Sequence, residues 1–353
     1  RSASAGAAVF DEVGGAGLHR GRAAVPVDLK SPADRDRVLD LLVRADALIE
    51  GFRPGVMERL GLGPDIVAGR SPRLVYGRVT GWGQTGPMAD QVGHDLNYLA
   101  LSGALHAMGE PDRPPRPPLN LIADYAAGAQ GLVIGLTAGV IEARRTGRGR
   151  VVDAAMTDGA ALLTGLFQAL RARGLWSDAR GANLLDGGAP FYRCYACADG
   201  RFVAVGALEP RFYAALLAGL DIPADQAPQY DLAGWPALHA RLESAFAARP
   251  RDVWADHFAG TEACVTPVLT LPEAPAHPHN RGRNTFDARG FPQTAPRFDG
   301  DDGRAPPDVV PLSLEAALEA WTIEAAARAA RGAAHASARV WTSRVGSIGV
   351  VRK

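Results

Sequence analysis

Three positions carry the side chains best suited to proton transfer. His94 stands beside Asp95 in a polar, glycine-flanked stretch. Asp124 precedes a helix rich in small residues, and Glu209 directly follows a predicted strand. Taken singly, such a histidine is more often a surface or core residue, and an aspartate before a helix is more often its N-cap. In combination with the basic loops described below, these residues favour general acid–base chemistry, because histidine titrates near neutrality and burial raises the pKa of a carboxyl.

The charge balance limits the kinds of partner. The chain has 38 Lys+Arg and 38 Asp+Glu, so no net field draws nucleic acid or a membrane surface. An anionic ligand has to be held by local basic clusters such as the loop Gly51–Gly55. No apolar run reaches the roughly 18 residues of a membrane-spanning helix, and the first residues lack the apolar core of a signal peptide. Three cysteines fit a reducing compartment, so we expect a cytoplasmic protein.

Two motifs resemble signatures of other functions, but neither match is good enough to support that function. Gly81–Gly86 fits the dinucleotide pattern G-x-G-x-x-G, but Pro87 follows at once and no helix pattern opens there. Cys194 and Cys197 would point to opposite faces of a strand, and Cys264 stands alone, so structural cysteines are favoured over a redox or zinc pair. Signatures of hydrolases, NTPases and zinc proteases are absent from the sequence. We expect no metal site.

The elements that position these residues alternate between strands and helices. Apolar runs separated by helical patterns predict a parallel sheet covered by helices, and the turn Asp199-Gly200 predicts a hairpin in a smaller α+β part. The predicted strands are 23–29, 47–49, 74–79, one beginning at 151, 191–197 and 201–207. The predicted helices are 31–45, 57–60, 122–142, one ending near 173, 210–220, 235–248 and 251–258.

Changes in composition predict two domains joined by two linkers. The tail beyond Trp321 has an Ala/Arg-rich run and then no clear period, so we assign it no function. The predicted order is 1–175 for the first part of a large domain, 176–190 for a linker, 191–270 for a small α+β domain, 271–310 for a return linker, 311–323 for the end of the large domain and 324–353 for an atypical tail.

Five segments in order resemble the family III CoA transferases and α-methylacyl-CoA racemases (the CaiB/BaiF type). The first resembles the signature of the whole family, the other four resemble its racemase branch, and the resemblance covers residues 18 to 321. The segments are Gly51–Gly63, Thr80–Pro87, Gly93–Tyr98, Pro118–Asp124 and Gly181–Pro190.

The resemblance implies roles for the candidate residues. His94, Asp124 and Glu209 fall where the racemase branch carries its acid/base residues. Two bases on opposite sides of a planar enolate would invert the α-carbon of a 2-methylacyl-CoA thioester, with Glu209 or Asp95 orienting His94. A backbone N–H near Asp124 is the expected oxyanion donor. CoA is part of the substrate, so no separate cofactor is expected. The implied CoA-binding residues are Val27, Asp28, Leu29, Lys30, Gly51, Phe52, Arg53, Arg59, Gly93, His94, Asp95, Leu96, Asn97, Tyr98 and Asn120.

The resemblance also implies a fold and an assembly. The family has a Rossmann-like large domain that binds CoA, a smaller α+β domain and two long linkers, and two chains interlock with the active site between them. We therefore expect a homodimer. Residues 1–17 do not match the start of the family, so we expect the first strand and helix of the large domain to be missing.

Two alternatives to the racemase remain open. One is a CoA transferase of the same family, with Asp124 as nucleophile. His94 and Gly181–Pro190 favour the racemase branch, and the consecutive glycines of the transferase branch are not found. The other alternative is an inactive CoA-binding fragment.

Overall fold

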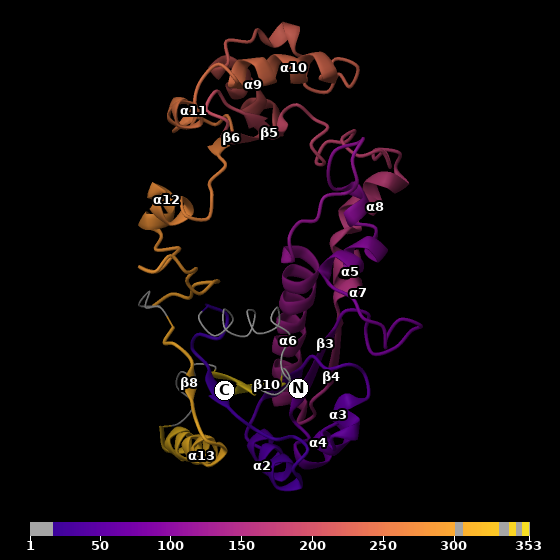
Figure 1. Cartoon of the computed structure of the whole chain (residues 1–353), viewed down its shortest axis with the longest axis vertical. Helices are drawn as coiled ribbons and strands as arrows, with labels where there is room; N and C mark the ends of the chain where they lie inside the picture. Colours follow the sequence, from indigo (N-terminus) through magenta and orange to yellow (C-terminus); the bar gives the residue numbers. More distant parts are fainter. Residues whose placement is uncertain (1–16, 301–305, 332–338, 344–347, 353) are drawn as a thin grey trace. The chain divides into compact units, whose positions relative to one another are not determined.

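The computed structural model describes residues 17–300, 306–331, 339–343 and 348–352, which belong to two units, each with its own sheet (Figure 1). The first unit comprises Arg1–Ser102, Pro118–Leu163 and Asp287–Lys353. The second comprises Gly103–Pro117 and Thr164–Phe286.

Among the described residues, the sheet of the first unit has seven strands in the order β4-β3-β2-β10-β9-β1-β8. Neighbouring strands are parallel except that β10 is antiparallel to both β2 and β9. The predicted parallel sheet is therefore confirmed for β1 to β4. The strands are β1 (Ala23–Val25), β2 (Ala47–Glu50), β3 (Val75–Thr80), β4 (Val151–Ala155), β8 (Val310–Pro311), β9 (Arg339–Ser343) and β10 (Ile348–Arg352).

Helices cover both faces of this sheet. Alternate residues of β2 point to opposite faces, so Leu48 joins one core and Ala47 the other. Leu48 packs in the core that includes Leu42 and Trp321, and Ala47 packs with Leu136. The helices of the first unit are α2 (Pro32–Leu42), α3 (Val56–Arg59), α4 (Pro64–Arg70), α5 (Asp95–Ser102), η2 (Leu121–Ala129), α6 (Gln130–Thr146), α7 (Met156–Leu163) and α13 (Leu314–Arg331).

Glycines let α6 approach the sheet closely. A Cβ added at Gly135 would lie 2.7 Å from Cγ1 of Val152, and one at Gly139 would lie 2.8 Å from Cγ1 of Val75. The predicted helix over 122–142 and its close packing through small residues are thus confirmed, whereas the expectation that this helix is buried was wrong, because much of it is exposed. With η2, which is π-helical, α6 forms one helix of 26 residues, Leu121–Thr146, that is long and apolar enough to cross a membrane by length and composition. Its uncharged part, Tyr125–Ile141, has 17 residues, which agrees with the prediction that no apolar run reaches about 18. A helix packed on a sheet also meets the criteria of length and composition.

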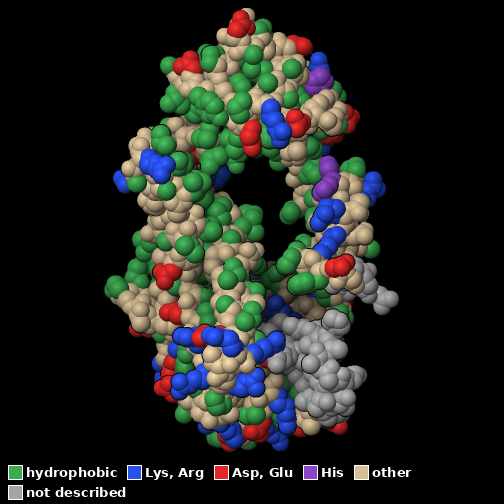
Figure 2. Space-filling view, turned by 180° about the vertical axis from the view of Figure 1, so that it is seen from behind, with side chains coloured by type: hydrophobic (Ala, Val, Ile, Leu, Met, Phe, Trp, Pro, Cys, Tyr) green, Lys and Arg blue, Asp and Glu red, His purple; other side chains and the backbone are tan. Residues whose placement is uncertain are grey.

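The outer face of α6 is apolar as well. Val133, Ile134 and Ile141 are all exposed, and Ile134 has an exposed fraction of 70%. In Figure 2 hydrophobic side chains run along the tall helical part of the first unit, above a cluster of Lys, Arg, Asp and Glu side chains. Monomeric proteins rarely expose many such side chains together, so this surface is suited to contact with another chain.

The tail forms elements that the sequence did not predict. Helix α13 continues into the Ala/Arg-rich run as far as Arg331, and the rest of that run lies outside the described residues. Within the stretch without a clear period, β9 and β10 pair with each other and fill the centre of the sheet between β1 and β2. These pairings join residues about 300 positions apart, which a local pattern cannot reveal.

The second unit contains a three-stranded antiparallel sheet, β5-β6-β7, among its described residues. The predicted hairpin at Asp199-Gly200 is confirmed, and Gly200 has the positive φ of 72° that the turn requires. Strand β7 was not predicted. The elements are β5 (Tyr192–Ala196), β6 (Phe202–Gly206), β7 (Val265–Pro267), α8 (Gly165–Ala172), α9 (Pro210–Gly219), α10 (Trp235–Phe246), α11 (Arg251–Phe258) and α12 (Pro278–Gly282).

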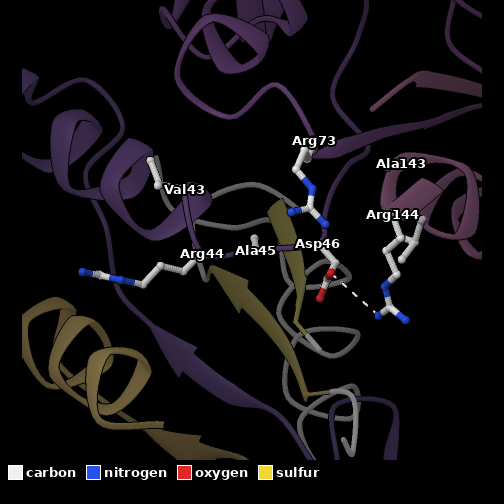
Figure 3. Close-up of a pocket in the computed structure, with 8 residues that line it drawn as sticks. Val43, Arg44, Ala45, Asp46, Arg73, Ala143 and Arg144 are labelled. Carbon is white, nitrogen blue, oxygen red and sulfur yellow. Dashed lines mark ion pairs between the residues drawn. The ribbon is translucent and has the colours of Figure 1, made fainter. Parts of the chain in front are cut away.

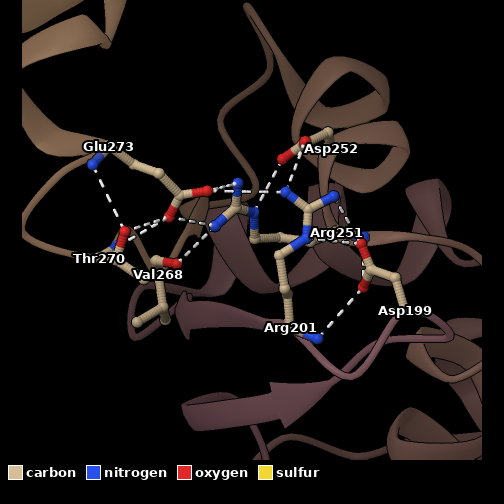
Figure 4. Close-up of polar contacts among 7 residues, drawn as sticks. All are labelled: Asp199, Arg201, Arg251, Asp252, Val268, Thr270 and Glu273. Carbon is tan, nitrogen blue, oxygen red and sulfur yellow. Dashed lines mark hydrogen bonds and ion pairs between the residues drawn. The ribbon is translucent and has the colours of Figure 1, made fainter.

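A buried arginine ties the parts of this unit together (Figure 4). Arg251, at the start of α11, donates from Nη2 to Oε1 of Glu273 at 2.8 Å and from Nε to Oδ1 of Asp252 at 2.8 Å. Its Nη1 also donates to the carbonyl of Val268 at 2.9 Å. Arg201 extends the cluster by pairing with Asp252 at 3.0 Å. The chain that leaves β7 is thereby fixed to α11.

Candidate active site

The loops expected to carry the site leave one edge of the first unit's sheet. Because β1, β2 and β3 run in the same direction, the segments after them emerge at a common carboxyl edge. Open α/β sheets bind ligands at this edge. The three segments are 26–30 after β1, 51–55 after β2 and 81–94 after β3.

The first of these segments offers two exposed side chains. Val27 and Leu29 are buried in the core, whereas Asp28 and Lys30 are exposed. Asp28 shapes the turn, since its carboxylate accepts from the backbone N–H of Lys30 at 3.0 Å. Lys30 forms no ion pair among the described residues, so its ammonium group is available to an anion.

A buried ion network anchors the second segment. Glu50, fully buried, accepts from Nε of Arg78 at 2.7 Å and from the backbone N–H of Phe52 at 2.7 Å. The other side of the Arg78 guanidinium donates to Glu58 at 2.7 Å and 3.3 Å. Burial raises the pKa of Glu50, whereas the hydrogen bond from Arg78 lowers the pKa of Glu58. The network joins the two ends of the loop 51–58.

The loop after β2 and helix α3 present two further cations. Arg53 and Arg59 are exposed and form no ion pair among the described residues. Gly55 lies between them with a φ of 78°, a conformation that favours glycine. Phe52 is half-buried and Gly51 is exposed. The cations are therefore carried on the loop after β2 and on α3, both of which the buried network holds in place.

The sequence did not lead us to predict that Arg78 and Glu58 hold this cationic segment in place. The signal was available, because Arg78 interrupts the otherwise apolar strand 74–79. A charged residue is almost never buried without a partner. Its presence in a strand therefore indicates a buried carboxylate nearby.

His94 stands at the entrance to α5. Its backbone N–H donates to Oδ1 of Asn97 at 3.0 Å, and its carbonyl accepts from the N–H of Asn97 at 2.8 Å. This reciprocal pair fixes the backbone of His94 and leaves its imidazole exposed. Leu96, the next predicted contact along α5, is also exposed.

Tyr98 fixes the residue before His94. Its hydroxyl donates to the carbonyl of Gly93, and its ring meets the edge of Trp82 at a centroid distance of 4.8 Å. Any side chain at Gly81 or Gly93 would collide with the Tyr98 ring. The glycines of the segment 81–93 are therefore needed for close packing beside His94.

Asp95 connects α5 to η2. It has an exposed fraction of 3%, and its Oδ2 accepts from the backbone N–H groups of Ala123 at 2.7 Å and Asp124 at 2.8 Å. It makes no hydrogen bond to the His94 ring. Its described contacts thus support Asp124, and the hypothesis that Asp95 orients His94 stays a prediction.

Asp124 is half-buried in the first turn of η2. Asn120, which is predicted to bind CoA, donates from Nδ2 to Oδ2 of Asp124 at 3.3 Å and so contacts the candidate acid. Burial raises the pKa of Asp124, the bond from Asn120 lowers it, the charge of Asp95 raises it and the charge of His94 lowers it. His94 and Asp124 are therefore within electrostatic reach of each other.

Comparisons with known proteins place this arrangement in a family. Residues 9–303 match CoA-transferase family III. The chain belongs to this family. It is 44% identical over 281 residues to a Mus musculus protein named alpha-methylacyl-CoA racemase, across 79% of this chain and 74% of that protein. The Homo sapiens protein of the same name is 43% identical over the same shares. A solved structure of a CaiB/BaiF family protein from Brucella suis has a TM-score of 0.69 at 25% identity, across 88% of this chain and 83% of that one.

In this family III chain, two of the backbone N–H groups at the expected place of the oxyanion donor are already occupied. The N–H of Asp124 and that of Ala123 both bond to Asp95. These two groups are therefore not available as the donor, and a backbone N–H near Asp124 stays a prediction. Asp95 and Leu96 are the first residues of α5, whose N–H groups have no acceptor within the helix.

Glu209 belongs to the second unit, whereas His94 and Asp124 belong to the first. As predicted, it follows a strand, β6, and it is the exposed N-cap residue of α9. Its side chain makes no capping bond. Its charge helps to raise the pKa of Cys264, after the larger effect of burial. The carboxylate is thus available to a further partner.

A pocket of about 210 Å³ lies at the opposite edge of the sheet, where β2 and β3 begin (Figure 3). Asp46 pairs with Arg144 at 3.9 Å there, and Arg73 points toward them from before β3. None of the predicted site residues lines it. Among the described residues, no group of three or more His, Cys, Asp and Glu side chains could hold a metal ion.

Proposed function

We propose that this chain is an acyl-CoA racemase, an isomerase that inverts the α-carbon of 2-methylacyl-CoA thioesters. The observation that carries the proposal is the 44% identity to a racemase across about three quarters of both proteins. The neighbouring His94 and Asp124 at the carboxyl edge supply the chemistry that such a reaction needs.

In the proposed mechanism, two bases face the α-carbon. One removes the α-proton, which the thioester carbonyl makes acidic, and the other returns a proton to the opposite side of the enolate. His94 serves one face and Asp124 the other, and their roles reverse for the opposite enantiomer. Burial is the main cause of the raised pKa of Asp124, which makes this carboxyl easier to protonate than an exposed aspartate. The first N–H groups of α5 are the proposed donors to the enolate oxygen.

The test uses each enantiomer of a 2-methylacyl-CoA in deuterated water. Both should reach the same racemic mixture, and the product should carry one deuterium at the α-carbon. An enzyme that neither inverts nor exchanges this position would refute the racemase.

Binding of the substrate should depend on its CoA group. Replacing Arg53 or Arg59 by Ala removes a cation that we assign to the CoA phosphates, and each charge-assisted bond contributes about 1–3 kcal/mol. KM for the thioester should therefore rise by about 5- to 150-fold per substitution, with kcat less affected.

Arg70 provides the matched control. It is an exposed arginine at the end of α4, outside the predicted contacts, so Arg70→Ala should leave KM unchanged. Free 2-methyl acids should not be processed. If they react as well as the thioesters, the assignment of these arginines to CoA is wrong.

The main alternative is acyl transfer, the reaction for which the family is named. There Asp124 would attack the thioester and form an acyl anhydride. A transferase has no need for a base at His94, and the presence of a histidine within electrostatic reach of Asp124 therefore favours the racemase.

We also infer that two copies associate and that Glu209 of one chain completes the site of the other. The support is the exposed apolar face of α6, at Val133, Ile134 and Ile141, and the free carboxylate of Glu209. A carboxylate beside His94 would hold its imidazole in one orientation.

The assembly has a direct test. Light scattering at micromolar concentration should give twice the mass of one chain, and Ile134→Glu should lower it. Ile66→Glu is the matched control, because Ile66 on α4 is similarly exposed, at 52%, outside this face. A fully active monomer would contradict both the dimer and the role of Glu209.

A further inference from the structure

Asp95 occupies a position that the two-base reaction alone does not explain. The geometry points to Asp95 as a positioning residue for Asp124, with a buried carboxylate that fixes the backbone of Asp124 and acts on its side chain through charge. This inference rests on the proposed function, in which Asp124 must hold a proton at one step and release it at another.

The first support is the pair of hydrogen bonds from η2. Oδ2 of Asp95 accepts from Ala123 at 2.7 Å and from Asp124 at 2.8 Å, and both donors lie in the first turn of η2. Asp95 thus caps η2 from a different helix, α5. Bonds from backbone N–H groups to an ionised carboxylate are strong, and the positive end of a helix dipole adds to them. The backbone of Asp124 therefore cannot move relative to α5 without breaking a bond to Asp95.

The second support is that no cation in the described part of the chain pairs with Asp95. Its Oδ1 is buried and meets no hydrogen-bond donor among the described residues. None of the ion pairs formed by these residues includes Asp95. An ionised carboxylate in such a site is compensated only by the N–H groups of η2, so its charge reaches the neighbouring carboxyl.

Other charged groups near η2 do not replace this effect. The groups that act on Asp124 are Asp95 and His94, and the Asp124 charge in turn contributes to the raised pKa of Tyr98, after burial. The remaining titratable or charged groups on elements packed against η2 are Tyr76 and Arg78 of β3, Asp153 of β4, Glu142, Arg144 and Arg145 of α6 and Asp158 of α7.

The consequence is a prediction for the pH profile. Burial raises the pKa of Asp124 most, and the Asp95 charge raises it further against the effects of Asn120 and His94. Removing that charge should lower the pKa of Asp124. The two-base reaction needs one proton shared between His94 and Asp124, so kcat/KM should follow a bell-shaped curve. On the acid side of this curve, the pair carries two protons and must lose one to become active. If the pKa of Asp124 falls, this acid limb should move to lower pH.

Asp95→Asn separates charge from position, because the amide oxygen can still accept both bonds from η2. We expect the acid limb to move down by about 1 pH unit, in both reaction directions, while the alkaline limb stays in place. Asp95→Ser is a second neutral variant with a hydroxyl acceptor, and it should move the same limb. Asp158→Asn on α7 is the matched control and should leave both limbs unchanged.

A titration without substrate decides the question independently of activity. Carboxyl ¹³C NMR of aspartate-labelled protein, with the Asp124 signal identified by its loss in Asp124→Asn, should show a lower midpoint for Asp124 in both neutral variants. An unchanged midpoint in either folded variant would overturn the proposal and leave Asp95 as a helix cap only. If the unsubstituted protein neither inverts nor exchanges its substrate, the racemase fails, and this titration still reports on Asp95.

Discussion

His94→Ala should abolish inversion while leaving α-hydrogen exchange for one enantiomer of a 2-methylacyl-CoA in deuterated water. Each base serves one face of the enolate, so loss of His94 stops proton removal on its own face. Asp124 can still remove the proton of the other enantiomer and return deuterium to the same face. Loss of a positioned base costs about 10²–10⁴-fold in rate, and inversion should fall by that amount for both enantiomers.

Asp124→Asn should give the mirror result, with exchange retained for the opposite enantiomer. Racemisation is followed by chiral chromatography of the thioesters and exchange by mass spectrometry. His279→Ala, which removes an exposed histidine of α12, is the matched control and should behave like the unsubstituted protein. If Asp124→Asn instead abolishes CoA transfer between acids and His94→Ala has no effect on it, the chain is a transferase.

Local patterns predicted the parts of this site that depend on neighbouring residues. The strand before the loop 51–55 and the hairpin at Asp199-Gly200 follow from apolar runs and turn residues, which act over a few positions. His94 and Asp124 could be chosen because their types and their places before helices are visible in the sequence. A helix-covered parallel sheet was therefore accessible from these elements, whereas the two-domain fold of the family was implied only by the resemblance.

Contacts between distant residues were not accessible. Asp95 bonds to η2 across 28 and 29 positions, and Arg78 reaches Glu50 across 28. Their geometry depends on how strands and helices pack, which neither periodicity nor residue type specifies. The same reason explains why the N–H of Asp124 could not be excluded in advance as the expected oxyanion donor near this residue. Only the folded chain reveals that Asp95 already occupies it.

The buried ion network of Glu50, Arg78 and Glu58 should be among the places where a substitution lowers the stability of the fold most. Arg78→Met removes the cation between Glu50 and Glu58 and leaves Glu50 buried without its partner. Breaking a buried ion pair in this way costs about 3–5 kcal/mol. The free energy of unfolding, measured by urea denaturation with circular dichroism, should fall by this amount. Arg150→Met, which breaks an exposed pair with Glu142, is the control and should change stability little.

The pH dependence of the stability of Arg78→Met tests whether the unpaired Glu50 carboxylate causes the loss of stability. Burial already raises the pKa of Glu50, and without Arg78 nothing but the Phe52 N–H opposes that effect. A carboxyl whose pKa is higher in the folded chain than in the unfolded chain favours folding below the unfolded value and loses that contribution as pH rises through the folded value. The stability deficit of the variant should therefore be largest at neutral pH and shrink as Glu50 becomes protonated. Adding Glu50→Gln to Arg78→Met should remove most of this pH dependence and recover part of the stability. A deficit that stays constant with pH would mean that lost packing of the arginine side chain, rather than the stranded charge, is responsible.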